Sequence, residues 1–104
     1  MKLRTMYRIL KTLLKYAGRQ DFTNELISAK KLGVSYEEWS YLLVLLQESG
    51  YVDGVVYTQT FSQRYPDIVD IDKLRITISG IEYVEENSTM KKIGQALKEI
   101  GEIL

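Results

Sequence analysis

A glycine at position 33 separates two stretches that each carry the signals of a helix start, and this junction constrains the fold more than any other feature of the chain. Thr23 is placed to cap a helix that ends near Leu32. Ser35 and Glu38 have the spacing of a capping box, which predicts a second helix directly after the glycine. Because glycine adopts the left-handed backbone conformation at little cost, we expect the chain to turn sharply between the two helices.

Side chains around this turn have the sizes that two crossing helices require. Ala29 is small where the helices are expected to approach most closely, and Val34 and Trp39 are placed as the hydrophobic staple of the second helix. Gly50 is expected to end that helix in a Schellman cap that brings Tyr51 back onto it. The expected core face consists of Trp39, Leu42, Leu43 and Leu46. The whole pattern predicts a helix-turn-helix.

A basic amphipathic helix is expected over residues 3–17, with Gly18 as its C-terminal cap. Its apolar face, at steps of three and four residues, consists of Leu3, Met6, Leu10, Leu13 and Ala17. The cations that precede the first acidic residue, Asp21, are Lys2, Arg4, Arg8, Lys11, Lys15 and Arg19. Residues 1–20 therefore carry a charge of +6 and residues 21–104 a charge of −6, so a net charge of zero hides a local basic face.

The segment after Gly50 changes to a β pattern. Residues 51–57 are rich in β-branched and aromatic side chains, and residues 68–71 and 74–76 both qualify as the strand that returns to them. The pattern does not decide between the two return segments. Thr77 is placed to cap a helix that runs to about residue 87.

These elements predict an α+β, mostly helical fold: a winged helix-turn-helix with a three-helix core, a β-hairpin wing and two C-terminal helices. No linker or internal repeat interrupts residues 1–104, so a single domain is expected. Within it, residues 88–104 are expected to form a C-terminal helix that packs either on the helix over residues 3–17 or on a second subunit.

This last segment carries an apolar seam of the kind found in coiled coils. Its members, spaced alternately three and four residues apart, are Met90, Ile93, Leu97, Ile100 and Leu104. Gly94 and Gly101 lie beside the seam, and glycine destabilises an isolated helix. Their placement favours close approach of another helix, from the same chain or from the second copy of a homodimer.

The chain contains the segments YRILK at residues 7–11, GYVDGV at residues 50–55 and ITISGIEYVEEN at residues 76–87. In these segments it resembles the YjcQ family of small bacterial and prophage proteins. The resemblance implies a small winged-helix protein. It transfers no catalytic residues and leaves the molecular role open.

Composition excludes several kinds of chemistry. Cysteine and histidine are absent, which removes disulfides, thiolate nucleophiles, imidazole bases and the common zinc sites. Asp67, Asp70 and Asp72, with Asp53 opposite, lack the central glycine and terminal glutamate of a calcium loop. We therefore expect no enzyme, no metal, no cofactor and no small-molecule ligand. No apolar run approaches the ~18 residues of a membrane span, so we expect a cytoplasmic protein without membrane contact.

The helix-turn-helix motivates the leading functional hypothesis, a transcriptional regulator that binds double-stranded DNA. In that hypothesis the helix after Gly33 enters the major groove and the wing touches the DNA backbone. The candidate DNA contacts are Lys30, Lys31, Tyr36, Ser40, Tyr41, Gln59, Gln63 and Arg64.

The expected solvent face of that helix weakens the hypothesis. It consists of Tyr36, Glu37, Ser40, Tyr41, Val44, Gln47 and Glu48, without lysine or arginine. Cations that displace counterions from phosphate supply most of non-specific DNA affinity. The alternative is a protein-protein interaction module that keeps the scaffold without binding DNA, with Phe61 and Tyr65 in the wing as candidate contacts. Cations of residues 2–19 on the same face as this helix or the wing would favour DNA.

Overall fold

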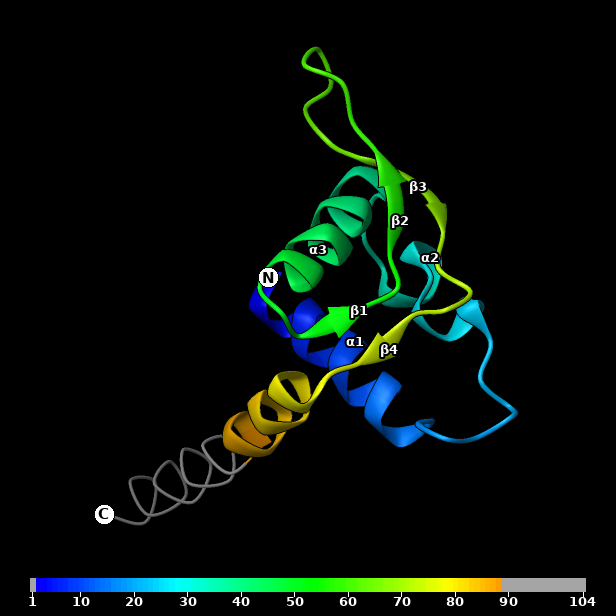
Figure 1. Ribbon diagram of the computed structural model, residues 1–104, viewed down its shortest axis with the longest axis vertical. Coiled ribbons are helices and arrows are strands. Elements are labelled where there is room, and N and C mark those ends of the chain that lie inside the picture. Colours follow the sequence, from blue (N-terminus) through cyan, green and yellow to red (C-terminus); the bar gives the residue numbers. More distant parts are fainter. Residues whose placement is uncertain (1, 89–104) are drawn as a thin grey trace.

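The computed structural model describes residues 2–88. Its elements, in chain order, are the helix α1 (Lys2–Lys15), the 3₁₀ helix η1 (Asn24–Ile27), the helices α2 (Ala29–Leu32) and α3 (Tyr36–Glu48), and the strands β1 (Val52–Asp53), β2 (Val56–Thr58), β3 (Asp67–Asp70) and β4 (Arg75–Ile76). Residues 78–88 are again helical. The fold is α+β and mostly helical, with two small antiparallel sheets beside α1 and α3 (Figure 1).

The turn at Gly33 has the predicted conformation. Gly33 lies in the left-handed region with φ 73°, and its amide bonds to carbonyls at the start of α2. The amide of Val34 donates to the carbonyl of Ala29 at 3.0 Å, which closes the end of α2. Only residues 33–35 therefore separate α2 from α3.

The helix before this turn differs from the prediction of one continuous helix that begins at Thr23. Thr23 makes no side-chain capping bond, and the residues that follow it form only the short 3₁₀ helix η1. Ser28 interrupts the helix with an extended backbone, and its hydroxyl accepts from the amide of Lys31 to start α2 anew. Serine favours such caps over helix interiors because its hydroxyl competes for backbone amides.

The capping signals of α3 are confirmed at both ends. The Ser35 hydroxyl accepts from the amide of Glu38 at 3.1 Å. At the other end, Gly50 has φ 83° and the amide of Tyr51 donates to the carbonyl of Leu46 at 2.9 Å. That bond is the long bond of a Schellman cap. The chain therefore leaves α3 in a defined direction, toward β1.

The buried face of α1 differs in part from the predicted one. Met6, Leu10 and Leu13 are buried as expected, but Leu3 is 68% exposed and Ala17 lies beyond the end of the helix and is exposed. Ile9, which the predicted stripe left out, is fully buried. The reason is that η1, α3 and β4 all contact α1, so its buried face is broader than one stripe.

Both return segments form strands, each with its own partner. β1 pairs with β4, with Val52 opposite Ile76, and β2 pairs with β3, with Tyr57 opposite Ile68. Gly54 separates the two pairs, with φ 94° and the backbone carbonyl of Lys73 so close that a Cβ would overlap it. The sequence did not decide between the two return segments because both are used. The first half of the segment after Gly50 pairs with one of them, and the half after Gly54 pairs with the other.

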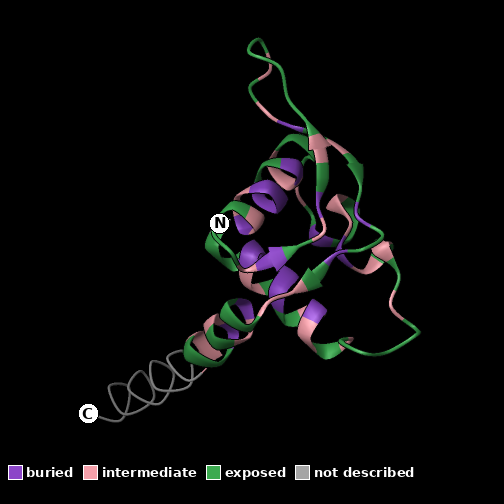
Figure 2. Ribbon diagram, viewed as in Figure 1, coloured by how far each residue is buried: buried purple, intermediate pink, exposed green. Residues whose placement is uncertain are grey.

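The core lies between α1, α3 and the strand region. Figure 2 shows buried residues on the sides of α1, α3 and β1 that face one another. The fully or almost fully buried residues of the core include Ile9, Leu10, Ile27, Leu42, Leu43, Leu46 and Val52. Trp39, predicted for the core, is half-buried, and its indole donates to the carbonyl of Ile27 at 2.7 Å, which ties α3 to η1.

The helix over residues 78–88 is attached where α3 ends. The Thr77 hydroxyl accepts from the amide of Gly80 at 3.1 Å, which confirms the predicted cap, and it donates to the carbonyl of Gly50. The amide of Thr77 donates to the carbonyl of Tyr51 at 3.0 Å. The rings of Tyr51 and Tyr83 pack with centroids 5.0 Å apart. These contacts explain the spacing of threonine, glycine and tyrosine in this segment.

None of the helices described in residues 2–88 is long and apolar enough to cross a membrane. The predicted seam of Met90, Ile93, Leu97, Ile100 and Leu104, and with it the packing of the C-terminal helix, lies outside the described residues.

A first prediction concerns Gly80. A Cβ at this buried position would overlap the carbonyl oxygen of Tyr51 and crowd the Ile76 side chain, so Gly80→Ala is expected to destabilise the protein by about 1–3 kcal/mol. Helix propensity alone would give the opposite sign, a gain of about 1 kcal/mol. Urea unfolding measures the difference, with Ser79→Ala as the exposed control. A Gly80→Ala variant at least as stable as the wild type would contradict this packing.

Candidate interaction surfaces

The outward side of α3 is acidic and narrower than predicted. Its exposed residues include Glu37, Tyr41 and Glu48, with Tyr41 44% exposed. Ser40 and Val44, expected on the solvent face, are buried at 0% and 6% exposure, so that expectation is wrong for both. The Ser40 hydroxyl donates to the carbonyl of Glu37 within its own helix. It is not available to a partner.

The β2–β3 hairpin lies beside α3 (Figure 1). The Tyr36 hydroxyl accepts from the amide of Ile68 at 2.9 Å, and the Tyr36 ring meets that of Tyr65 edge-on at 6.4 Å. Pro66, in the return arm of the hairpin, is fully buried. The hairpin is therefore fixed to α3 by the bond between the Ile68 amide and the Tyr36 hydroxyl and by an aromatic contact.

Some of the candidate DNA contacts come together at this boundary. A narrow cleft is lined by Tyr41 and Glu48 from α3 and by Gln59 and Arg64 from the hairpin. Gln63 instead holds the hairpin loop. Its side-chain oxygen accepts from the backbone amide of Thr60 at 2.8 Å, and its side-chain nitrogen donates to the Asp67 carboxylate at 2.8 Å. Lys30 and Lys31 are exposed at the end of α2 and do not line this cleft.

Gln47 has a structural role that the sequence did not indicate. Its side-chain oxygen accepts from the amide of Val55 at 2.7 Å, and its side-chain nitrogen donates to the carbonyl of Val55 at 3.0 Å. The carboxamide thus acts like a neighbouring strand for one residue. Val55 is 6% exposed, so this pair of bonds replaces the water that its backbone would otherwise need.

A second prediction follows from this pair of bonds. Gln47→Ala leaves the buried backbone of Val55 without a partner, and the expected cost is about 1–3 kcal/mol of stability. Glu48→Ala, at the exposed neighbouring position, serves as the control and should change stability little. Urea unfolding gives the free energy, and hydrogen exchange at the Val55 amide reports the local bond. Unchanged exchange at Val55 in Gln47→Ala would refute this role.

The aspartates of the hairpin are used in its turns. Asp67 accepts from Gln63, Asp70 accepts from the amide of Asp72 at 2.8 Å, and Asp72 accepts from Asn24 at 2.9 Å. Within residues 2–88, no three acidic side chains are grouped so that they could hold a metal ion. The observed role of these carboxylates is to accept hydrogen bonds, from the side chains of Gln63 and Asn24 and from the backbone of residue 72.

The cations of α1 form one row. Arg4, Arg8, Lys11 and Lys15 are all exposed, and at the 100° per residue of a helix they fall within an arc of about 60°. The ion pairs found among residues 2–88 are Arg19–Asp21 and Arg75–Asp53, so no carboxylate of that part neutralises the row. We call these residues the α1 basic row.

The α1 basic row borders the end of α2. The Arg8 guanidinium donates to the carbonyl of Leu32 at 3.1 Å, where a cation also complements the negative end of the short helix. Lys30 and Lys31 belong to the same last turn and are exposed. The strongest contacts of α1 are with β4, α3 and η1, and none of this strength links it to the β2–β3 hairpin. The basic row therefore borders the end of α2.

Arg19, predicted as part of the basic region, is held by its neighbour Asp21. Its Nε and Nη2 donate to the two carboxylate oxygens at 2.9 and 2.6 Å. This hydrogen bonding lowers the pKa of the Asp21 carboxyl and raises the pKa of the Arg19 guanidinium. A lowered carboxyl pKa stabilises the folded state above the unfolded pKa and the effect is lost on acidification, but both groups are exposed and the contribution is small.

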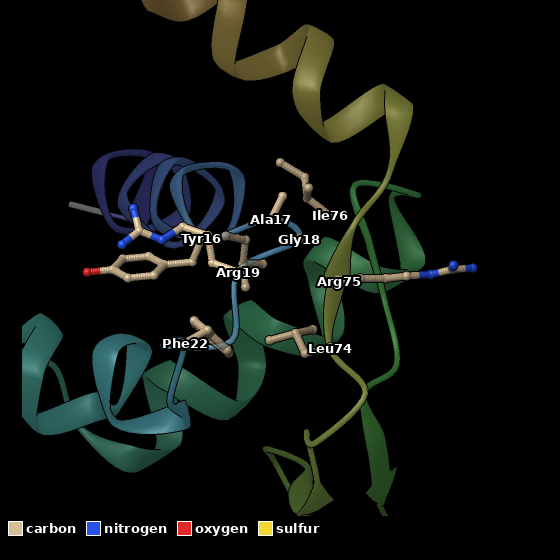
Figure 3. A pocket seen from close by; sticks show the side chains of 9 residues that line it. Tyr16, Ala17, Gly18, Arg19, Phe22, Leu74, Arg75 and Ile76 are labelled. Atoms are coloured by element: carbon tan, nitrogen blue, oxygen red, sulfur yellow. The ribbon is translucent and has the colours of Figure 1, made fainter.

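A cleft of about 250 Å³ lies between the end of α1 and β4. Figure 3 shows Phe22 and Leu74 pointing toward each other across it, and the guanidinium of Arg75 pointing away from it. Arg19, at its other edge, is already paired with Asp21. The cleft is lined mainly by apolar carbon atoms, and of its two cations Arg75 points away from it and Arg19 is paired with Asp21.

The architecture defines a small, mostly helical α+β protein with one acidic and one basic surface. A family model, described as YjcQ protein, matches residues 7–103. Since the match covers nearly the whole chain, the protein belongs to the YjcQ family. No curated protein and no solved structure matches the chain.

Proposed function

We propose that this member of the YjcQ family is a winged-helix scaffold that binds another protein and does not read DNA through α3. The order of elements supports the winged-helix part: α1 comes first, the turn at Gly33 joins α2 to α3, and the β2–β3 hairpin lies beside α3. A binding role is the usual use of so small a scaffold, but fold alone does not choose the partner.

One observation carries the choice of partner: the side of α3 that would face DNA is either covered or acidic. Ser40 and Val44 are buried, whereas Glu37 and Glu48 occupy the exposed side. Carboxylates repel phosphates, and among base edges they accept hydrogen bonds chiefly from cytosine. The outward side of α3 has no cation to offset that repulsion.

The tip of the hairpin supports the same choice. Phe61 is fully exposed there, and the loop residues around it form hydrogen bonds with one another. An exposed aromatic ring on a projecting loop is suited to bury itself in a partner protein, where aromatic residues contribute much of the binding energy. Phosphate backbones offer such a ring little.

A DNA-associated transcriptional regulator is the competing proposal, and the exposed cations favour it. Lys30 and Lys31 on α2, Arg64 on the hairpin and the α1 basic row can all contact phosphates. Such contacts would position the protein on a duplex without reading its sequence. The exposed cations therefore favour non-specific binding to DNA over sequence-specific binding.

Selection from a random duplex library at low ionic strength separates the two proposals. We expect no enriched sequence, because the exposed side of α3 is acidic and its remaining polar residues are used within the fold. Tyr41→Ala and Glu48→Ala should leave any residual binding within about twofold of the wild type. An enriched sequence whose binding is lost in Tyr41→Ala would establish readout by α3 and defeat the proposal.

The apolar seam in residues 90–104 motivates a separate proposal of a homodimer, tested by sedimentation. Leu97→Asp combined with Ile100→Asp should reduce the mass from dimer to monomer, because two buried carboxylates would have to lose their hydration. Lys98→Asp lies between these positions but off the seam and should leave the dimer intact. A wild-type protein that sediments as a monomer at all concentrations excludes the dimer.

A further inference from the structure

No ion pair within residues 2–88 involves the charges of the α1 basic row. Of its members, Arg8 donates a hydrogen bond to the backbone of α2. Arg4, Lys11 and Lys15 form no ion pair with any of residues 2–88. The row extends over about 16 Å, the rise of eleven helical residues. Cations in line over three turns, with no ion pair from residues 2–88, form an attractive surface for an extended anionic partner.

An apolar edge runs along one side of this row. Leu3 is 68% exposed, and Tyr7 and Leu14 are half-buried. At 100° per residue these side chains fall within about 40° of one another, directly beside the row. The ammonium of Lys11 lies 5.9 Å from the centre of the Tyr7 ring, so the apolar edge and the basic row are in contact.

The repeat of these residues indicates the shape of the partner. Arg4 and Lys11 are seven residues apart, as are Arg8 and Lys15, and Tyr7 and Leu14 share the same interval. A heptad interval is the one at which helices pair along their lengths. A partner helix with an apolar seam flanked by carboxylates would cover the edge and the row together.

We infer that this surface of α1 is the docking site for an acidic amphipathic helix of a partner protein. The inference rests on the proposed function, because it names the chemistry of the protein that the scaffold would bind. Duplex DNA matches the cations but gains nothing from Leu3 or Tyr7, since phosphates carry no apolar groups. Within residues 2–88, a second copy of this chain offers acidic side chains on α3, but Glu37 and Glu48 flank Tyr41 rather than an apolar seam. The apolar seam over residues 90–104 of a second copy is a separate occupant, which the self-association measurement tests.

A synthetic three-heptad peptide with leucine at its seam positions and glutamate beside them is a direct probe. Fluorescence anisotropy at low ionic strength should detect its binding to the full-length protein, and the affinity should fall as salt is added. Arg4→Glu combined with Lys11→Glu should weaken binding by about tenfold or more. Lys73→Glu changes an exposed cation elsewhere and should leave the affinity unchanged.

Leu3→Ser separates this docking mode from a purely electrostatic one. Leu3 is exposed, so its replacement should leave folding unaffected, but the peptide should bind several-fold more weakly because less apolar surface is buried. A duplex DNA probe measured against the same variants completes the experiment. Its binding, where present, should not respond to Leu3→Ser.

The outcomes distinguish a wrong surface from a wrong function. Absence of peptide binding, or peptide binding that ignores both the charge reversal and Leu3→Ser, overturns the inference and leaves the proposed function standing. Duplex DNA that binds more tightly than the peptide and is lost in Arg4→Glu with Lys11→Glu overturns both. A third outcome is that the protein binds no peptide but associates with itself, and that Arg4→Glu with Lys11→Glu abolishes this self-association. That result assigns the surface to a second copy and also overturns the inference.

Discussion

The end of α3 is the point on which the rest of the architecture depends. Gly50 turns the chain out of the helix, and the carbonyls of Gly50 and Tyr51 then accept from the hydroxyl and the amide of Thr77. Gly80 packs against the same Tyr51 carbonyl, where no side chain fits. One helix terminus therefore sets the direction of β1, the pairing of β1 with β4, and the start of the helix over residues 78–88. The last carbonyls of α3 accept from amides of residues 49–51, and the carbonyls of Gly50 and Tyr51 that follow find their partner in Thr77, a distant part of the chain.

This geometry also determines which side chains of α3 stay exposed. β1 leaves the end of α3, the paired strands divide at Gly54, and β2 and β3 lie beside the helix. Gln47 and Tyr36 secure them by binding backbone groups of Val55 and Ile68. Side chains that a helix-turn-helix protein would use for recognition are spent on the fold. The charged side chains that α3 still exposes, Glu37 and Glu48, are acidic, and the proposed binding surface is therefore α1.

The molecule is consequently electrostatically divided. Residues 1–20 and residues 21–104 carry opposite charges of equal size, and in the structure this division becomes a basic row on α1 and an acidic strip on α3. Oriented charge of this kind guides association and selects partners more than it adds affinity. Apolar groups beside the row, such as Leu3 and Tyr7, are what would convert encounter into stable binding.

The sequence by itself determined the local events. Caps at Ser35 and Thr77 and left-handed glycines at 33 and 50 follow from short-range hydrogen bonding and backbone sterics, which act within a few residues. It also determined the family and the charge asymmetry. Tertiary structure decided the break at Ser28, the division of the ribbon at Gly54 and the burial of Ser40. Each depends on which surface another element covers, as with Leu3, which keeps the periodicity of a core residue and yet faces solvent because no described neighbour packs over it.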